Sequence, residues 1–231
     1  MKKILAIHDI STMGKAGLNV VMPILSSFGN DVLPLPTCAL SSITGGFGEY
    51  YKTDLSEQMW NSVKHFKRIN QHFDYIYSGY LSNSEQVEIV AEIVKDNPEA
   101  IFVCDPVMAD HGKLYAGYDE RIIDAMNELV SIADIATPNY TEYEMLGEIK
   151  APAFCVTSYP NKEEQPIDIL CSLENVTNML QGNYNPEPIS GTGEAFTSHL
   201  IAYGIEGNSF FESCQLAMDK MQEYINILQT K

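Results

Sequence analysis

The sequence predicts an α/β protein with one mostly parallel central sheet and helices on both of its faces. Short apolar runs alternate along the chain with longer segments in which apolar residues recur at helical spacing. Alternation of this kind is typical of parallel strands joined by crossover helices. The chain has 231 residues, 45% of them apolar, so we expect one sizeable core and a single domain over residues 1–231.

The expected strands are short apolar runs, most of which end in polar residues or glycine. In chain order they are KILAIH (3–8), DVLPLPTCAL (31–40), FDYIYSGYL (73–81), AIFVCDPVM (100–108), DIATPN (134–139), AFCVTSY (153–159) and DILCS (168–172). Pro34 and Pro36 favour an edge or irregular position for the second run, because proline cannot donate a ladder hydrogen bond. The polar segment YPNKEEQPI (159–167) is expected to be a solvated loop.

The expected helices show an apolar face or end at a residue that stops a helix. Gly29 closes the first, and Asn97-Pro98 stops the third. The segments are 17–29, 55–69, 84–98, 119–133, an apolar stretch that begins after the GTGE turn at 191–194, and 210–228.

Composition excludes several classes of protein. The 31 acidic residues outnumber the 14 basic ones, the formal net charge is -17, and no basic run exceeds Lys2-Lys3, which argues against a nucleic-acid partner. No apolar stretch approaches the length of a membrane span, so no membrane partner is expected. The five cysteines form no C-x-x-C pair and the N-terminus resembles no secretion signal. We therefore expect a cytoplasmic protein with buried, reduced thiols.

Polar residues and glycines gather where the expected strands end. In open α/β sheets, ligands bind beyond the carboxyl ends of the strands. The polar residues concerned are His8, Asp9, Ser11, Thr44, Tyr80, Asp105, Asp110, Tyr115, Thr137, Asn139, Glu142 and Thr157, and the glycines are Gly14, Gly17, Gly45, Gly46, Gly48 and Gly79. Taken singly, each has an ordinary alternative as a strand stop, a helix start, a loop residue or a packed aromatic. Their joint position favours a binding site.

The stretch PISGTGEAF (188–196) places two glycines around Thr192 and an acid at Glu194, where an apolar helix begins. Free N–H groups at such a turn can hold an anion. Carboxylates and an asparagine at strand ends can hold Mg²⁺, and both features together suit phosphoryl transfer. Glu194 would accept the proton of an attacking hydroxyl while the turn holds the developing negative charge. The alternative is that Glu194 only caps the helix.

The motifs DPVMADHGKLY, TPNYTE and GTGEAF together resemble the ribokinase-like superfamily. SSITGGF and FDYIYSGYL are similar to its vitamin B6 kinases, and that likeness runs along nearly all of the N-terminal two-thirds of the chain. The resemblance implies a three-layer sandwich and an ATP-dependent kinase that uses Mg²⁺. Its substrate would be the 5′-hydroxymethyl group of pyridoxal, pyridoxine or pyridoxamine. Its partners would be that small molecule, ATP and a second copy of the chain in a homodimer.

The resemblance also implies a role for each motif residue. Asp9, Ser11, Thr44 and Tyr80 would line the substrate pocket. Asp105, Asp110, Tyr115, Thr137, Asn139 and Thr157 would lie along the nucleotide, with Glu142 and Asp105 at the metal. Gly191, Thr192 and Gly193 would form the anion hole, with Glu194 as the catalytic base.

The chain departs from the family pattern in three places. Glu194 stands where the family has the Asp of GTGD, and one extra methylene displaces the carboxylate. Asp9 stands where the family usually has Ser or a variable residue, and Ile43 stands where the family usually has His. The domain is shortened between about 145 and 190, where almost no room remains for a helix before AFCVTSY.

Two alternatives therefore stay open. GKAGLNVV also resembles the kinases of hydroxymethylpyrimidine and phosphomethylpyrimidine, whose substrate is likewise a flat heteroaromatic ring with a hydroxymethyl group. Alternatively, the chain is a catalytically impaired relative that only binds its ligand.

Overall fold

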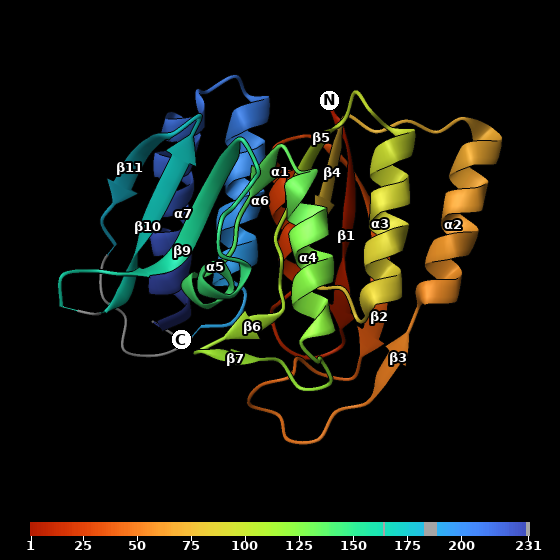
Figure 1. Ribbon diagram of the computed structural model, residues 1–231, viewed down its shortest axis with the longest axis horizontal. Helices are drawn as coiled ribbons and strands as arrows, with labels where there is room; N and C mark the ends of the chain where they lie inside the picture. The colour runs from red at the N-terminus through yellow and green to blue at the C-terminus, as the bar shows by residue number, and fades with distance from the viewer. Residues whose placement is uncertain (164, 183–188, 230–231) are drawn as a thin grey trace.

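The computed structural model describes residues 1–163, 165–182 and 189–229. Its centre is a nine-stranded sheet in the order β11-β10-β9-β8-β5-β4-β1-β2-β3 (Figure 1). The strands of this sheet are β1 (Lys3–Ser11), β2 (Asp31–Leu40), β3 (Lys52–Asp54), β4 (Tyr75–Ser78), β5 (Ile101–Cys104), β8 (Ile135–Ala136), β9 (Ala153–Pro160), β10 (Pro166–Leu173) and β11 (Val176–Leu180). The six strands from β9 to β2 in this order pair in parallel, whereas β3, β10 and β11 join antiparallel, so the predicted mostly parallel sheet is confirmed.

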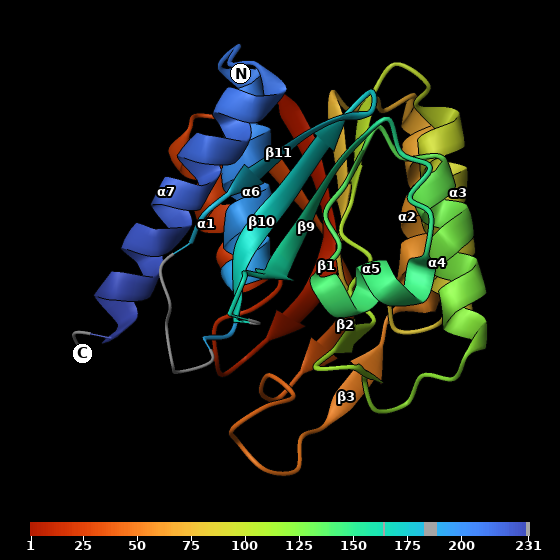
Figure 2. The ribbon, with the colours of Figure 1, turned by 60° about the vertical axis from the view of Figure 1, so that its left-hand side comes forward.

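Helices cover both faces of this sheet. They are α1 (Leu18–Ser27), α2 (Ser56–Ile69), α3 (Ser84–Asp96), α4 (Arg121–Ser131), α5 (Tyr140–Leu146), α6 (Thr192–Ile205) and α7 (Phe210–Gln229). α1, α6 and α7 lie on one face, and α2 to α5 lie on the other (Figure 2). The expected three layers are therefore confirmed. None of the described helices is long and apolar enough to cross a bilayer.

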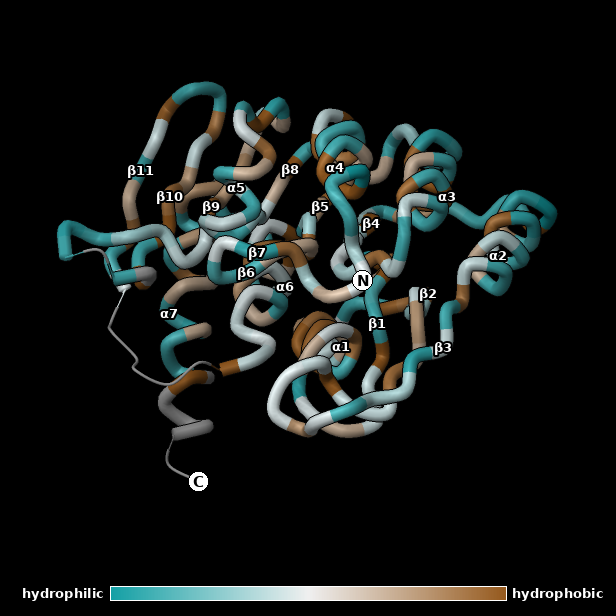
Figure 3. The backbone as a smooth tube through the Cα atoms, turned by 60° about the horizontal axis from the view of Figure 1, so that its bottom comes forward, coloured by the Kyte–Doolittle hydropathy of each residue, from teal (hydrophilic) through white to brown (hydrophobic). Residues whose placement is uncertain are grey.

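The core is divided between the two faces of the sheet. Leu5 and Ile7 of β1 pack with the α2–α4 layer, whereas Ile4 and Ala6 pack with α1 and α6. Successive side chains of a strand point to opposite faces, so a strand covered on both sides is apolar throughout. In Figure 3 hydrophobic residues gather along β1 and α1, whereas hydrophilic residues dominate the outer helix α2.

The prolines of β2 occupy an edge, as predicted. β3 pairs only with the stretch Cys38–Leu40 of β2, so Pro34 and Pro36 lie where β2 has β1 as its one neighbour among the described strands. The missing N–H groups therefore interrupt no second ladder.

The expected loop over 159–167 is wrong at both ends. β9 continues to Pro160 and β10 begins at Pro166, and Tyr159 pairs with Asp168 across this hairpin. The described polar residues Asn161, Lys162 and Glu163 follow the end of β9. Sequence patterning also missed β3, α5, β11 and the small hairpin β6 (Ala109–Asp110) and β7 (Lys113–Leu114). Residues 147–152 contain no helix, in keeping with the lack of room before AFCVTSY.

Candidate active site

The carboxyl ends of the parallel strands meet at one edge of the sheet, and many of the predicted site residues lie along it. Asp9 and Ser11 end β1 and are buried, Asp105 follows β5, and Thr137 follows β8. Helix α6 starts against the same edge, because the Glu194 side chain on its first turn reaches the turn after β1. The structure therefore brings the main motif residues together around one region.

The GTG turn opens α6, as the sequence predicts. Gly191 is the N-cap residue with φ of 88°, a conformation that glycine adopts without strain. A Cβ atom on Gly191 would lie 2.7 Å from the carbonyl oxygen of Lys15, so the turn also needs glycine for close approach to the segment before α1. Thr192 and Gly193 follow in the first turn, whose N–H groups have no acceptor within the helix. They are suited to an anion.

The Glu194 carboxylate is anchored at the start of two helices. Its Oε1 accepts a hydrogen bond of 3.0 Å from the N–H of Gly17, the N-cap residue of α1, and lies 3.8 Å from Nε2 of His8. The side chain is 15% exposed, so it is held in place yet still open to a ligand. The additional methylene of glutamate thus ends in a defined contact with the neighbouring helix.

His8 lies between two carboxylates. The sequence predicts its place among the polar residues at the strand ends but assigns it no role. Its Nδ1 lies 2.7 Å from Oδ1 of Asp9, and its Nε2 faces Glu194. Burial lowers the pKa of His8, but the hydrogen bond to Asp9 and the charges of Asp9, Glu194 and Asp105 outweigh it, so the pKa is raised. The only signal in the sequence was a histidine directly before Asp9 in an otherwise apolar strand.

The position of the His8 ring also explains why residue 79 is a glycine. A Cβ atom on Gly79, directly after β4, would lie 1.9 Å from Cδ2 of His8, so only glycine fits there. The N–H of Tyr80 points to Nε2 of His8 at 3.4 Å. The imidazole is thus enclosed by β1, the end of β4 and α6.

Negative charge is concentrated around Asp105. The side chain is buried and accepts a hydrogen bond of 3.4 Å from Oη of Tyr77. Burial and the charges of Glu142 and Glu194 raise the pKa of Asp105 well above its ordinary value. Burial and the charges of Glu142, Asp110, Glu194 and Asp105 likewise raise the pKa of Tyr115. Such a cluster favours a cation, and the Asp105 carboxylate is a candidate ligand for one.

Both carboxylate oxygens of Glu142 accept hydrogen bonds from backbone N–H groups. Oε1 accepts hydrogen bonds from the N–H groups of Met108 and Ala109 at 2.9 and 3.2 Å, and Oε2 accepts one from the N–H of Asn139 at 2.8 Å. Asn139 and Glu142 form a capping box at the start of α5, and Asn139 Nδ2 donates to the carbonyl of Ala109. Burial raises the pKa of Glu142 to about 8 despite these donors. Its contacts hold the loop after β5 against α5.

Two of the expected nucleotide residues lie on neighbouring strand ends. Thr137 is buried, and its Oγ1 accepts a hydrogen bond of 3.0 Å from Thr197 of α6. Thr157 of β9 forms a parallel bridge with Asn139. Asp110 is 48% exposed on the β6–β7 hairpin.

The expected substrate residues Thr44 and Tyr80 differ in exposure. Thr44 is exposed on the segment between β2 and β3, whereas Tyr80 is partly buried. Nζ of Lys52 donates a 3.0 Å hydrogen bond to Oη of Tyr80, and the ring centroids of Tyr80 and Tyr118 lie 5.8 Å apart. No pattern in the sequence predicted Lys52 at this position, because it follows a glycine-rich loop on a three-residue strand.

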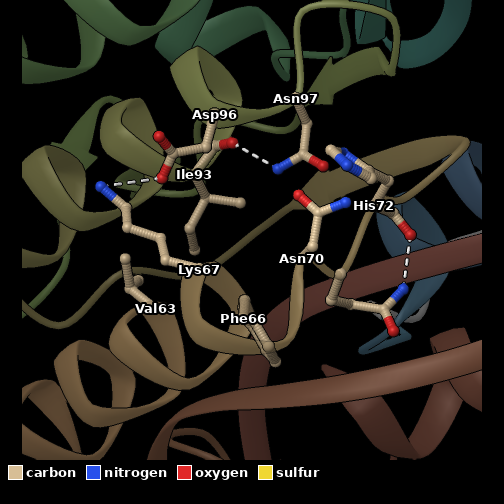
Figure 4. Close-up of a pocket in the computed structure, with 9 residues that line it drawn as sticks. Val63, Phe66, Lys67, Asn70, His72, Ile93, Asp96 and Asn97 are labelled. Atoms are coloured by element: carbon tan, nitrogen blue, oxygen red, sulfur yellow. Dashed lines mark hydrogen bonds and ion pairs between the residues drawn. The ribbon is translucent and has the colours of Figure 1, made fainter.

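A cavity between α2 and α3 belongs to a different part of the molecule (Figure 4). Its volume is about 200 Å³, and it lies beside Asn70 and Asn97, which cap the C-terminal ends of the two helices. Helices that connect parallel strands run antiparallel to them, so these ends lie at the amino edge of the sheet. The Lys67–Asp96 ion pair of 3.0 Å lies in this cavity, which carries none of the predicted motifs.

Comparison with known protein families gives one match. Residues 62–158 match the family described as phosphomethylpyrimidine kinase.

Curated relatives are pyridoxal kinases by name. A protein of Schizosaccharomyces pombe, provisionally named a pyridoxal kinase, is 27% identical, with 98% of this chain and 82% of its own length covered. A pyridoxal kinase of Paraburkholderia phymatum is 33% identical, with 63% of this chain and 53% of its own length covered. Apart from the first, the matched region spans about half the length of these relatives.

Solved structures share the whole fold. A protein of Bacteroides thetaiotaomicron, provisionally named a phosphomethylpyrimidine kinase, has a TM-score of 0.92 at 30% identity, with 100% of this chain and 88% of that chain covered. A second crystal form of it, solved with pyridoxal, has a TM-score of 0.82 at 32% identity and coverages of 94% and 85%. Pyridoxal kinase from Leishmania donovani in complex with ADP and pyridoxine has a TM-score of 0.82 at 25% identity and coverages of 97% and 86%.

Proposed function

Because the chain belongs to the pyridoxal kinase family of the ribokinase-like superfamily, a family of small-molecule kinases, we propose that it phosphorylates the 5′-hydroxymethyl group of a vitamin B6 vitamer with ATP. The position of Glu194 carries this proposal. Its carboxylate lies on the GTG turn, is held by the Gly17 N–H, and stays partly exposed at the carboxyl edge of the sheet. Relatives solved with pyridoxal, or with ADP and pyridoxine, support the choice of substrates.

Glu194 is the general base in this proposal. It accepts the proton of the attacking hydroxyl, and the N–H groups of Gly191–Glu194 hold the transferring phosphoryl group. His8 positions the Glu194 carboxylate, since Nε2 of His8 faces Glu194 while Nδ1 is bound to Asp9. A positioned general base contributes about 100- to 10,000-fold to the rate.

The remaining motif residues hold the two substrates. In this proposal the nucleotide is bound by Asp105, Asp110, Tyr115, Thr137, Asn139 and Thr157. The vitamer is bound by Asp9, Ser11, Thr44 and Tyr80. Mg²⁺, when bound, neutralises charge on the phosphates. Asp105 is its direct ligand in this proposal, while Glu142 supports the site through the backbone bonds of the loop after β5. We include a homodimer in the proposal, which sedimentation analysis tests.

A kinase of hydroxymethylpyrimidine or phosphomethylpyrimidine is the second candidate. The family match over residues 62–158 and the provisional name of the Bacteroides thetaiotaomicron protein favour it. The pyridoxal in one crystal form of that same protein favours the vitamer.

A coupled ADP-release assay with Mg²⁺-ATP separates the candidates. Pyridoxal, pyridoxine, pyridoxamine and hydroxymethylpyrimidine are tested in parallel with the wild type, with Glu194→Ala, and with Glu206→Ala at the exposed end of the same helix as the matched control. We expect one vitamer to give the highest kcat/KM, with turnover lost in Glu194→Ala and kept in Glu206→Ala. Preference for the pyrimidine supports the second candidate. Absence of turnover with all four compounds refutes both and favours a relative that only binds its ligand.

A further inference from the structure

Three cysteines from separate elements converge in the layer between the sheet and α7. Cys155 and Cys171 are directly opposite each other on the antiparallel pair β9 and β10, so their side chains share a face. Cys214 of α7 packs onto that face. The Sγ atom of Cys155 lies 3.6 Å from that of Cys171 and 3.4 Å from that of Cys214. All three residues are fully buried and reduced.

Apolar packing alone explains why the three cysteines are buried, but not why their Sγ atoms converge on one point. A free cysteine behaves as a small hydrophobic residue, and Phe196, Leu200 and Ala217 provide an apolar surrounding here. The three Sγ atoms all lie within 4.8 Å of one another. A point between three atoms at these separations is about 2.4 Å or less from each of them, close to the metal–thiolate bond length of about 2.3 Å.

The composition of the cluster determines which cation fits. Of the histidine, cysteine, aspartate and glutamate residues that the structure describes, no fourth joins these three. Structural zinc sites are almost always four-coordinate, whereas soft thiolate ligands also select Cu(I). A thiolate buried among apolar side chains requires a compensating cation.

We propose that Cys155, Cys171 and Cys214 form a three-coordinate site for a soft monovalent cation of the Cu(I) class. Binding of one monovalent cation releases one thiol proton to solvent, so the buried site gains no net charge and the affinity rises with pH. The site ties β9 and β10 to α7. It is independent of the proposed kinase activity, since none of its residues belongs to the GTG turn or to the ends of β1, β4 and β5.

Metal retention under anaerobic, reducing conditions tests the site. The wild type and the variants Cys171→Ala and Cys214→Ala are each incubated with Cu(I) in competition with a chromogenic chelator and then desalted. Cys38→Ala, which removes a buried thiol of β2 outside the cluster, is the matched control. Far-ultraviolet circular dichroism establishes that each variant is folded.

We expect the wild type and Cys38→Ala to keep one Cu(I) per chain and the two cluster variants to lose it. X-ray absorption should give three sulfur neighbours, and bound Cu(I) should raise the Tm of the wild type but not of Cys214→Ala. Absence of retention by the wild type overturns the proposal, as does equal retention by either cluster variant. Preference for Zn²⁺ over Cu(I) in the same competition overturns the three-coordinate assignment.

Discussion

Replacing His8 with leucine removes the partner of a buried carboxylate at the candidate site. Asp9 is 6% exposed, and its Oδ1 lies 2.7 Å from Nδ1 of His8. Breaking a buried ion pair on one side costs about 3–5 kcal/mol, because the remaining charge is left without compensation. The Ser11 hydroxyl still donates to Oδ2 of Asp9 at 3.2 Å, so we expect about 3 kcal/mol. For a chain of this size that corresponds to a loss of about 6–12 °C in Tm.

The loss should depend on pH with a definite sign. The folded-state pKa of His8 is raised above its ordinary value of 6.5, so its contribution to stability is fully present below that pH. The contribution disappears as the pH rises through the folded-state pKa. Burial raises the pKa of Asp9, but the hydrogen bonds from His8 and Ser11 and the charge of His8 together outweigh it, so the pKa is lowered. The contribution of Asp9 is therefore lost only as the pH falls through that lower value. The stability gap between wild type and variant is therefore wide near pH 6 and narrows toward pH 9.

Urea denaturation of the wild type and His8→Leu at about pH 6 and about pH 9 measures this gap. His65→Leu, on the exposed face of α2, is the matched control and should change stability little at either pH. His8→Asn, which keeps a donor near Asp9, should lie between the wild type and His8→Leu. A gap that is the same at both pH values, or that widens toward alkaline pH, refutes the charged pairing of His8 with Asp9.

Two other positions give predictions with internal controls. Gly191→Ala should destabilise the fold by more than about 1 kcal/mol and lower kcat, because its φ is 88° and its Cβ would meet the Lys15 carbonyl. Gly207→Ala is the control, because Gly207 has a φ of 93° but no atom near its added Cβ, so this variant suffers the backbone strain alone. Equal losses of the free energy of unfolding in the two variants, measured by urea denaturation, would contradict the close-approach argument. Glu142→Gln should cost about 1–3 kcal/mol, because an amide nitrogen would then face a backbone N–H donor. Glu144→Gln on the exposed side of α5 should cost little, and a thermal shift that is the same for both would contradict this role.

The elements of the fold were predictable where burial produces a long hydrophobic pattern in the sequence. β1 is apolar from Ile4 to Ile7 because both of its faces are covered there, and the GTG turn opens α6 as expected. The β6–β7 hairpin has two residues in each strand, which is too short for any periodicity to show. Both strands of the β9–β10 hairpin were predicted, but their ends at 159–160 and 166–167 were assigned to the polar loop between them, because pairing there depends on tertiary contact.

Sequence motifs predicted residues that the structure brings together at one edge of the sheet, but not the contacts between them. The motifs placed Asp9 at a strand end and Glu194 at the start of a helix, whereas the bond from Gly17 to Glu194 joins residues 177 positions apart. His8 was placed at the same strand end but given no role, because its contact with Glu194 of α6 is equally distant in sequence. The capping box of Asn139 and Glu142 is local and readable from their spacing of three. The motif suggested a metal ligand there, whereas the structure shows both carboxylate oxygens bonded to backbone N–H groups.

Formation of a phosphorylated vitamer is the most direct test of the proposed kinase. Wild type and Glu194→Gln are mixed with Mg²⁺-ATP and pyridoxal, and the product is identified by mass spectrometry over time. The variant keeps the size of the side chain and an oxygen for the Gly17 N–H. We predict pyridoxal 5′-phosphate from the wild type and a rate lower by about 100- to 10,000-fold in the variant, with unchanged pyridoxal affinity. Absence of product from the wild type, or equal rates in the two proteins, would contradict the account.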